Sequence, residues 1–218
     1  QWLGMDFDEG PLVGGGDKGD YGPYRQSERL DMYEKYLTQL LTEKNAYYCF
    51  CTEEEIEGQR QSMLTEGIAP RYNGKCRSVT AEQAEEYKRA GKPSAIRFKT
   101  PEEKVNFTDM IRGKVSFDAA LFGDIVIAKN LQEPLYNFAV VVDDYAMKIS
   151  HVIRAEDHLA NTPKQILMQK ALGFEHPEYG HLPLILNTDR SKMSKRLNAV
   201  SIAQYKELGY IPQALVNF

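Results

Sequence analysis

Four cationic side chains within seven residues are the part of this sequence best suited to chemistry. They are Arg190, Lys192, Lys195 and Arg196, with the flexible Met193 between them, and they follow an apolar run. Nothing in this segment builds a core. A cationic loop of this kind can hold a triphosphate and stabilise the charge that develops as pyrophosphate leaves. The spacing alone is also compatible with an exposed basic turn.

Arg154 is a second candidate, because a guanidinium can bind a carboxylate through two parallel hydrogen bonds that a neutral amide cannot return. A hydrogen bond to a charged group contributes about 1.5–3 kcal/mol, enough to separate an acid from its amide by roughly tenfold or more. The alternative is a buried structural ion pair with Asp143 or Asp144.

The three cysteines form a third constellation. Cys49 and Cys51 are separated by one residue, and Cys76 follows 25 positions after Cys51. Cys-x-Cys places two thiolates on one turn of the chain, and a tetrahedral zinc needs two further ligands. The alternative is three buried, reduced thiols. An odd number of cysteines argues against a disulfide framework and favours a reducing cytoplasm.

Composition narrows the possible partners. With a net charge of −4, the chain as a whole does not attract polyanions. A nucleic acid would therefore have to bind local basic patches such as 71–77 and 190–196. The 42 % hydrophobic and 27 % charged residues are ordinary for a soluble globular protein. No apolar run approaches the ~20 residues that span a bilayer, so no membrane partner is expected. The start without Met and the end within an apolar run suggest a longer parent protein.

Periodicity and capping signals predict the elements that position these residues. The predicted helices are 28–44 after Ser27, 53–64, one starting at Thr80 with Gln83 as its capping-box partner, 162–172 ended by Gly173, and one from Ser201 to Leu208. The predicted strands are 95–99, 105–108, 114–117, 125–129, 138–142, 148–153 and 182–186. The β-branched run 138–142 is interpreted as a strand buried on both faces of a parallel sheet. The fold class is therefore α/β, interrupted by a smaller α+β module.

Several segments together resemble bacterial-type glutamyl-tRNA synthetases, which are class I aminoacyl-tRNA synthetases. They are Lys-Met-Ser-Lys at 192–195, Tyr-Asn-Phe-Ala-Val-Val-Val-Asp-Asp at 136–144, the segment 149–158, Asn-Thr-Pro at 161–163, and 22–29. The resemblance covers essentially the whole chain. It implies a Rossmann-like nucleotide-binding domain split by an insertion that grips the tRNA acceptor stem. Residues 1–45 would belong to its first half, 46–134 to the insertion, and 135–218 to its second half and the start of a helical domain.

The resemblance also implies roles for individual residues. Lys195 would contact the ATP phosphates with support from Lys192 and Arg196, and Met193, Asp157 and His158 would lie near ATP. Tyr136 and Arg154 would bind glutamate, and the alternative role of Tyr136 is core packing. For zinc, the family often supplies a His two residues after the third cysteine, where this chain has Ser78. Tyr72, the substitute in some relatives, would complete Cys49, Cys51 and Cys76.

The implied reaction is the ATP-dependent attachment of L-glutamate to tRNA(Glu) through a glutamyl-adenylate, with Mg²⁺ accompanying ATP, by a cytoplasmic monomer. Two alternatives stand beside it: a paralogue that glutamylates a queuosine-type tRNA base, and a non-catalytic tRNA-binding module. The His-x-Gly-His segment of the class does not occur in the sequence. The 218-residue chain alone is therefore expected not to aminoacylate tRNA.

Overall fold

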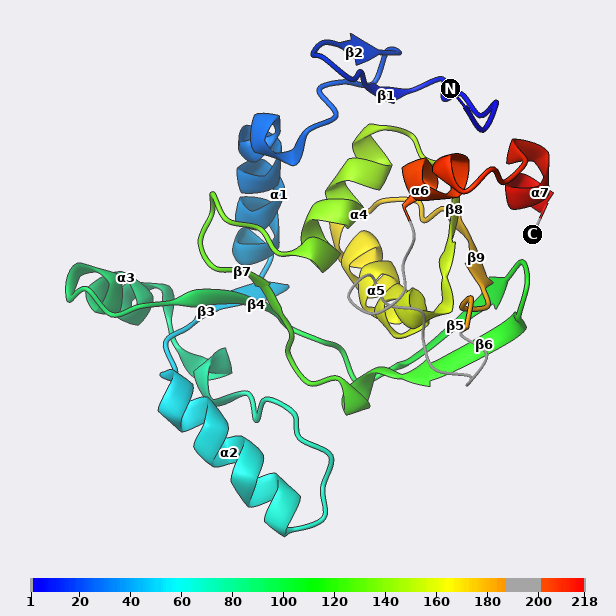
Figure 1. Ribbon diagram of the computed structural model, residues 1–218. Coiled ribbons are helices and arrows are strands. Elements are labelled where there is room, and N and C mark those ends of the chain that lie inside the picture. Colours follow the sequence, from blue (N-terminus) through cyan, green and yellow to red (C-terminus); the bar gives the residue numbers. More distant parts are fainter. Residues whose placement is uncertain (1, 187–200, 218) are drawn as a thin grey trace.

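Three β-sheets surround a central group of helices in the computed structural model, which describes residues 2–186 and 201–217 (Figure 1). The α-helices are α1 (Leu30–Thr42), α2 (Glu53–Thr65), α3 (Ala81–Arg89), α4 (Tyr136–Ala146), α5 (Thr162–Leu172), α6 (Ile202–Glu207) and α7 (Pro212–Asn217). Short 3₁₀ helices are η1 (Gln26–Glu28), η2 (Lys75–Ser78), η3 (Ala119–Leu121) and η4 (Glu156–Asn161).

The strands form a small hairpin, an antiparallel sheet and a mixed sheet. The hairpin pairs β1 (Gly10–Pro11) with β2 (Asp17–Lys18), and the antiparallel sheet has the order β3 (Ala46–Cys49), β4 (Ala95–Phe98), β7 (Val126–Ala128). The mixed sheet has the order β6 (Gly113–Asp118), β5 (Lys104–Asp109), β9 (Glu178–Leu182), β8 (His151–Ala155). β5 and β8 both run parallel to β9, which joins strands far apart in the sequence.

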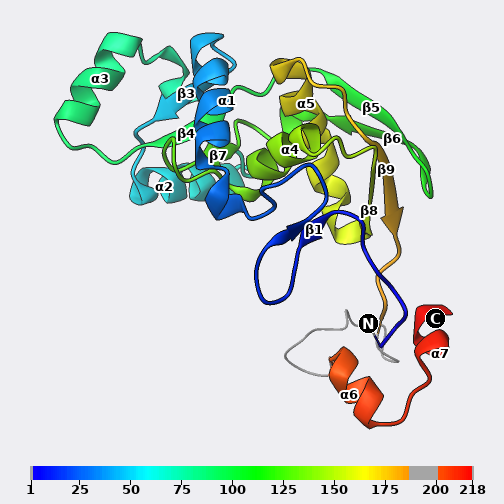
Figure 2. The same cartoon turned by 90° about the horizontal axis from the view of Figure 1, so that it is seen from above.

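The core lies where α1, α4 and α5 pack together between the antiparallel sheet and the mixed sheet (Figures 1 and 2). Tyr33 and Leu37 of α1 reach it at helical spacing, and α5 contributes Leu167 and Met168. Burying each such side chain contributes about 1.5–3 kcal/mol, so this cluster fixes α4 and α5 relative to each other. Figure 2 shows α6 and α7 beyond the carboxyl end of β9. No described helix combines the length and apolar character needed to cross a bilayer.

Most of the predicted elements are confirmed, and so is the α/β fold class. The capping box of Thr80 with Gln83 begins α3, Ser201 caps α6, and Gly173, at a φ of 72°, ends α5. The predicted strands at 95–99, 105–108, 114–117 and 125–129 correspond to β4, β5, β6 and β7. The short strand β3 and helix α7 were not predicted.

The prediction of a strand at 138–142 is wrong, because these residues lie in α4. Phe138, Ala139, Val141, Val142 and Asp143 are all buried, since α1, α5 and β7 enclose the helix. A helix that is covered on most sides is apolar on most sides, and its pattern then loses the alternation of an amphipathic helix. A short apolar run of this kind cannot be told from a buried strand by periodicity.

Three further predictions were displaced. The strand predicted at 182–186 overlaps β9 only at Leu182, because Pro183 has no N–H to continue the ladder. The strand predicted at 148–153 starts later, at His151, because Lys148 at a φ of 53° still belongs to the turn after α4. Ser27 lies within η1 and does not cap α1, which begins at Leu30.

Candidate functional site

Arg154 lies at the centre of a polar cluster that β8, β9 and α5 build together. Its Nε donates to Nε2 of His181, 3.2 Å away, and its Nη2 donates to Oγ1 of Thr162 at 2.9 Å and to Oε1 of Gln165 at 2.8 Å. The parallel register pairs Arg154 with His181 across the two strands, and Thr162 and Gln165 share one face of α5. Three of the five guanidinium donors are thus engaged by neutral acceptors.

The remaining end of the Arg154 guanidinium faces Tyr136. Its Nη1 lies 3.5 Å from the Tyr136 hydroxyl, which lies 3.2 Å from Nδ1 of His158. Tyr136 begins α4 and is 48 % exposed, so its ring does not serve core packing. The structure therefore brings together three of the residues that the sequence singles out, with an accessible hydroxyl beside a guanidinium nitrogen.

No acidic side chain of the described residues forms an ion pair with Arg154. Asp143, one of the two carboxylates considered for that role, accepts from Arg29 Nε and from the Tyr33 hydroxyl, each at 2.7 Å. The other, Asp144, makes no side-chain hydrogen bond with the described residues. Burial raises the pKa of Asp144 to about 6, although the field of Arg154 opposes the shift. The structural alternative for Arg154 is thus not the arrangement found.

The remaining predicted site residues are placed only in part. Asp157 lies exposed on η4, next to His158. Lys192, Met193, Lys195 and Arg196 lie outside the described residues. In the sequence they follow the carboxyl end of β9. Because β8 is parallel to β9, the carboxyl end of β8, where Arg154 lies and η4 follows, is at the same edge of the sheet.

The residues of β9 and α5 that bind the Arg154 guanidinium were not predicted from the sequence. Thr162 and Gln165, which bind Arg154, and Gln169, which accepts from Tyr179, recur at spacings of three and four along α5, and all are buried among apolar residues. That polar stripe was the available signal, because buried polar groups need partners. His181 is fully buried on β9, and its Nδ1 lies 2.6 Å from Oδ2 of Asp109. No spacing in the sequence links Asp109 to His181.

The three cysteines meet at a second site, between β3 and η2. Their sulfur atoms all lie within 4.8 Å of one another, and the three thiols are free. The Tyr72 hydroxyl lies 3.4 Å from the sulfurs of both Cys49 and Cys51 and accepts from the backbone N–H of Cys76 at 2.9 Å. Gly123, at a φ of 60°, permits this approach, because a Cβ there would lie 3.1 Å from the Tyr72 nitrogen.

These distances fit a tetrahedral metal. With Zn–S bonds of ~2.3 Å and Zn–O bonds of ~2.0 Å, tetrahedral angles place sulfurs about 3.8 Å apart and an oxygen about 3.5 Å from each sulfur. The observed values are 3.6 Å between Cys51 and Cys76 and 3.4 Å from the Tyr72 oxygen to two sulfurs. Three of the six separations among these four donors thus lie near the values that one ion would impose, and the three sulfurs all lie within 4.8 Å of one another.

The surroundings of the cysteine cluster shift the pKa values of two of its thiols in opposite directions. Arg97 is 9 % exposed, its guanidinium lies 3.9 Å from the Tyr72 ring centre, and its Nε has no acceptor among the described residues. Burial opposes ionisation of Cys49, but Tyr72, a backbone amide and Arg97 lower its pKa. Burial dominates at Cys51 and raises its pKa to about 11. The buried Arg97 guanidinium, next to Tyr72 and acting on Cys49, is placed to compensate part of the negative charge that thiolate ligands would bring.

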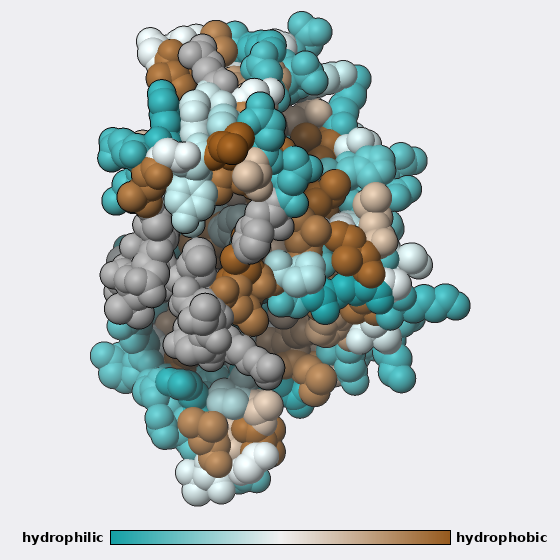
Figure 3. Space-filling view, turned by 45° about the vertical axis from the view of Figure 1, so that its right-hand side comes forward, coloured by the Kyte–Doolittle hydropathy of each residue, from teal (hydrophilic) through white to brown (hydrophobic). Residues whose placement is uncertain are grey.

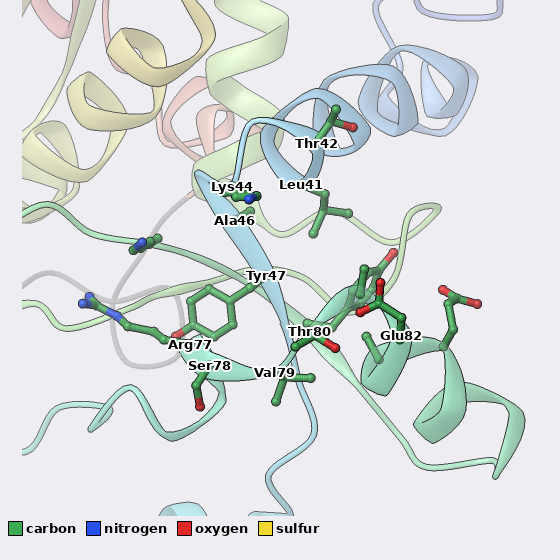
Figure 4. A pocket seen from close by; sticks show the side chains of 15 residues that line it. Leu41, Thr42, Lys44, Ala46, Tyr47, Arg77, Ser78, Val79, Thr80 and Glu82 are labelled. Atoms are coloured by element: carbon green, nitrogen blue, oxygen red, sulfur yellow. The ribbon is translucent and has the colours of Figure 1, made fainter.

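A cavity of about 710 Å³ lies beside β3 and α3, away from Arg154 (Figure 4). Lys44, Arg77 and Lys99 line it together with Glu82 and Glu85. Arg77 itself is paired, because its Nη2 donates to Oδ1 of Asp124 at 2.6 Å. The mixed charges of this cavity provide no convergent set of catalytic groups.

One face of the mixed sheet is apolar, on the side of the molecule seen in Figure 3. Ile153, Leu182, Met110 and Ile111 are 61 %, 47 %, 53 % and 48 % exposed. Gly180 lies among them, with Ile111 3.5 Å from the position of a Cβ. Side chains alternate along β8 and β9, so this apolar surface and the Arg154 guanidinium lie on opposite faces of the sheet.

Comparisons with known proteins agree on one family. A family model described as "tRNA synthetases class I (E and Q), catalytic domain" matches residues 1–218. Glutamate–tRNA ligases of Carboxydothermus hydrogenoformans and Bacillus licheniformis are 53 % and 50 % identical over the whole chain, which covers 45 % of each relative. The chain therefore spans about half the length of these relatives.

Solved structures give the same answer. The glutamate–tRNA synthetase of Elizabethkingia anophelis superposes with a TM-score of 0.83 at 37 % identity, over 99 % of this chain and 48 % of that one. The glutamate–tRNA ligase of Elizabethkingia meningosepticum, solved in complex with its amino acid, has a TM-score of 0.84 at 37 % identity. The match over all 218 residues shows that this chain belongs to the catalytic-domain family of class I tRNA synthetases for glutamate and glutamine.

Proposed function

We propose that the full-length protein is a glutamate–tRNA ligase, which activates glutamate with ATP and transfers it to tRNA(Glu). The relatives at 50–53 % identity are named as such ligases, which supports this activity over a base-modifying paralogue or a non-catalytic module. In this reaction the glutamate carboxylate attacks the α-phosphate of ATP and releases pyrophosphate. A ribose hydroxyl of the terminal adenosine then attacks the activated carbonyl and releases AMP.

The observation that carries the proposal is a guanidinium with neutral partners and one open end. Arg154 Nη1 and the Tyr136 hydroxyl converge on one point from two elements. The side-chain carboxylate of glutamate would accept from both, in place of the two-nitrogen grip that the sequence suggests. Glutamine would lose the charge-assisted part of this interaction, at a cost of about 1.5–3 kcal/mol.

We place ATP beyond the carboxyl ends of β8 and β9, where ligands of open parallel sheets bind. His158 and Asp157 of η4 border this region, and the cationic loop with Lys192, Met193, Lys195 and Arg196 follows β9 in the chain. Lys195, supported by Lys192 and Arg196, would hold the phosphates and stabilise the leaving pyrophosphate. Mg²⁺ would enter with ATP and neutralise phosphate charge.

We further propose that residues 46–134 form the insertion that contacts the tRNA acceptor stem. This segment contains the cysteine cluster, α2 and α3, and exposed cations such as Arg71 and Lys75. Phosphate contacts from such cations position a nucleic acid without reading its sequence. The β5–β6 hairpin of this segment is hydrogen-bonded to β9, so the insertion is anchored to the second half of the catalytic domain.

We assign Cys49, Cys51, Cys76 and Tyr72 as ligands of one structural zinc ion, which would tie η2 to β3. Metal analysis of the purified full-length protein should find one zinc per chain, and Cys76→Ser should lose it. Ser78→Ala, two residues away, is the matched control and should retain the metal. Wild-type protein without zinc, prepared under reducing conditions with zinc present, would contradict the assignment.

The activity is tested with the full-length protein, ATP, tRNA(Glu) and glutamate or glutamine. Arg154→Ala should raise the KM for glutamate by about tenfold or more and leave that for ATP unchanged. Ribonuclease digestion of the charged tRNA should release glutamyl-adenosine, which identifies the terminal ribose as the acceptor. Glutamate found on an internal base would instead favour the base-modifying paralogue.

A further inference from the structure

We infer that Asp109 and His181 are positioning residues, which orient the Arg154 guanidinium for glutamate through a buried hydrogen-bond relay. The inference rests on the proposed role of Arg154 and adds two residues to it. Asp109 is 1 % exposed and His181 is fully buried, so neither touches a substrate directly. Their effect on the reaction passes through Arg154.

The first step of the relay fixes the proton on the imidazole. Nδ1 of His181 lies 2.6 Å from Oδ2 of Asp109, while Nε2 lies 3.2 Å from the Arg154 Nε that donates to it. An atom that accepts from a guanidinium cannot carry a proton, so the hydrogen-bond pattern assigns the proton to Nδ1. His181 thus donates to Asp109 and accepts from Arg154.

The second step is the rigidity of Asp109. Its Oδ1 accepts from the backbone N–H groups of Ile111 at 3.0 Å, Arg112 at 2.9 Å and His181 at 3.2 Å. Burial alone would raise the pKa of Asp109, but the hydrogen bonds from His181 and the backbone lower it to about 2. The carboxylate is therefore ionised and fully coordinated, and it cannot rotate without breaking the turn between β5 and β6.

The third step is the orientation of Arg154. With Nε held by His181 and Nη2 held by Thr162 and Gln165, the guanidinium plane has a single position, and Nη1 projects toward Tyr136. Nε is the atom nearest the pivot of the guanidinium group. If its acceptor became a donor, the plane would rotate and carry Nη1 away from the Tyr136 hydroxyl.

The relay also links two parts of the chain. Asp109 ends β5, within the segment 46–134 that we assign to the acceptor stem, whereas Arg154 lies in β8. The adjacent Arg112 forms an ion pair with Glu156 of η4, which ties the same turn to the site a second time. The β5–β6 turn thereby becomes part of the support of the proposed amino-acid site.

Asp109→Asn tests the relay with almost no change in shape. Its Oδ1 still accepts from the three backbone amides, but an NH₂ group now faces Nδ1 of His181. The imidazole proton must then move to Nε2, where it opposes the Arg154 Nε–H. The control is Tyr179→Phe, on the same strand as His181. It removes the buried hydrogen bond from the Tyr179 hydroxyl to Oε1 of Gln169 and leaves the relay intact.

In the full-length protein, Asp109→Asn should raise the KM for glutamate by about tenfold or more, with the KM for ATP unchanged, while Tyr179→Phe leaves both unchanged. Nitrogen-15 NMR of labelled imidazoles should show His181 protonated at Nδ1 in the wild type and at Nε2 in Asp109→Asn. A wild-type proton on Nε2, or a glutamate KM in Asp109→Asn equal to that of Tyr179→Phe, would overturn the inference.

Arg154→Ala distinguishes a failure of the relay from a failure of the proposed function. If Arg154→Ala raises the glutamate KM and Asp109→Asn does not, the relay is wrong and the proposed function stands. If Arg154→Ala leaves the glutamate KM unchanged, the assignment of the amino-acid site is wrong, and the relay falls with it.

Discussion

Arg29 and Arg154 are the cations of two networks that share helix α4, and they are satisfied in opposite ways. Arg29 is 3 % exposed and pairs with a carboxylate, Asp143, which the Tyr33 hydroxyl also binds. Arg154 is half-buried, and its partners are a threonine, a glutamine and a histidine. The first network is complete within the chain. Among the described residues the second network contains no anion, and that difference supports the proposed role of Arg154 in binding glutamate, whereas Arg29 is held within the fold.

The largest effect should come from breaking the complete network. Asp143→Ala leaves the Arg29 charge buried without a counterion, which should lower the free energy of unfolding by about 3–5 kcal/mol. Denaturant unfolding followed by circular dichroism measures this loss. Asp144→Ala, at the next position of the same helix, removes a carboxylate that has no such partner and serves as the control. Equal losses for the two variants would contradict the contrast.

The incomplete network can be completed by mutation. Gln165→Glu places a carboxylate at the oxygen that lies 2.8 Å from Arg154 Nη2. The new anion should neutralise the guanidinium and raise the KM for glutamate by about tenfold or more in aminoacylation assays. Gln165→Met also removes the hydrogen bond from Gln165 Nε2 to Asn137 Oδ1, but it adds no charge. It should therefore raise the KM for glutamate less than Gln165→Glu does. A wild-type KM for Gln165→Glu would show that Arg154 does not select the acid.

Asp144 offers a smaller, pH-dependent test. Its pKa rises from an ordinary 3.8 to about 6 through burial, so folding favours the protonated acid. The contribution of Asp144 to stability is therefore greatest below pH 4 and is lost as the pH rises through 6. Asp144→Asn mimics the protonated form and should raise the free energy of unfolding by about 1–3 kcal/mol at pH 7.5.

Unfolding measurements at pH 7.5 and below pH 4 check this dependence, because the gain should vanish at the lower pH. A gain of the same size at both values would remove Asp144 as its cause. Asp143→Asn should bring no such gain, since the charge of Asp143 is matched by Arg29.

What the sequence reveals depends on how local each signal is. Thr80 with Gln83 and Gly173 mark helix ends, because the partners of a cap lie within a few residues. The cysteine cluster was partly predictable for the same reason, since Cys49 and Cys51 are separated by one residue and only Cys76 comes from a distant part of the chain. The apolar run at 138–142 led to a wrong prediction of a strand. Its pattern reflects burial on most sides of the segment, which a helix and a strand can share.

The polar support of Arg154 could not be predicted from spacing. Arg154 and Tyr136 were found through their resemblance to a family, and their assigned role stays a prediction. The partner of His181 is Asp109, whose proximity depends on the parallel pairing of β5 with β9. A single sequence contains no periodicity that specifies such a pairing, because parallel strands are joined by long connections of variable length.

The pairing of β5 with β9 also sets an order for synthesis on the ribosome. Asp109 and His181 are 72 positions apart, so the β5–β6 hairpin emerges long before the strand that covers its edge. An uncovered edge is open to pairing with other chains, and long-range parallel contacts form slowly. The nascent protein must therefore protect this hairpin until α4, α5 and β9 have been made, and the polar cluster around Arg154 is among the last features to be completed.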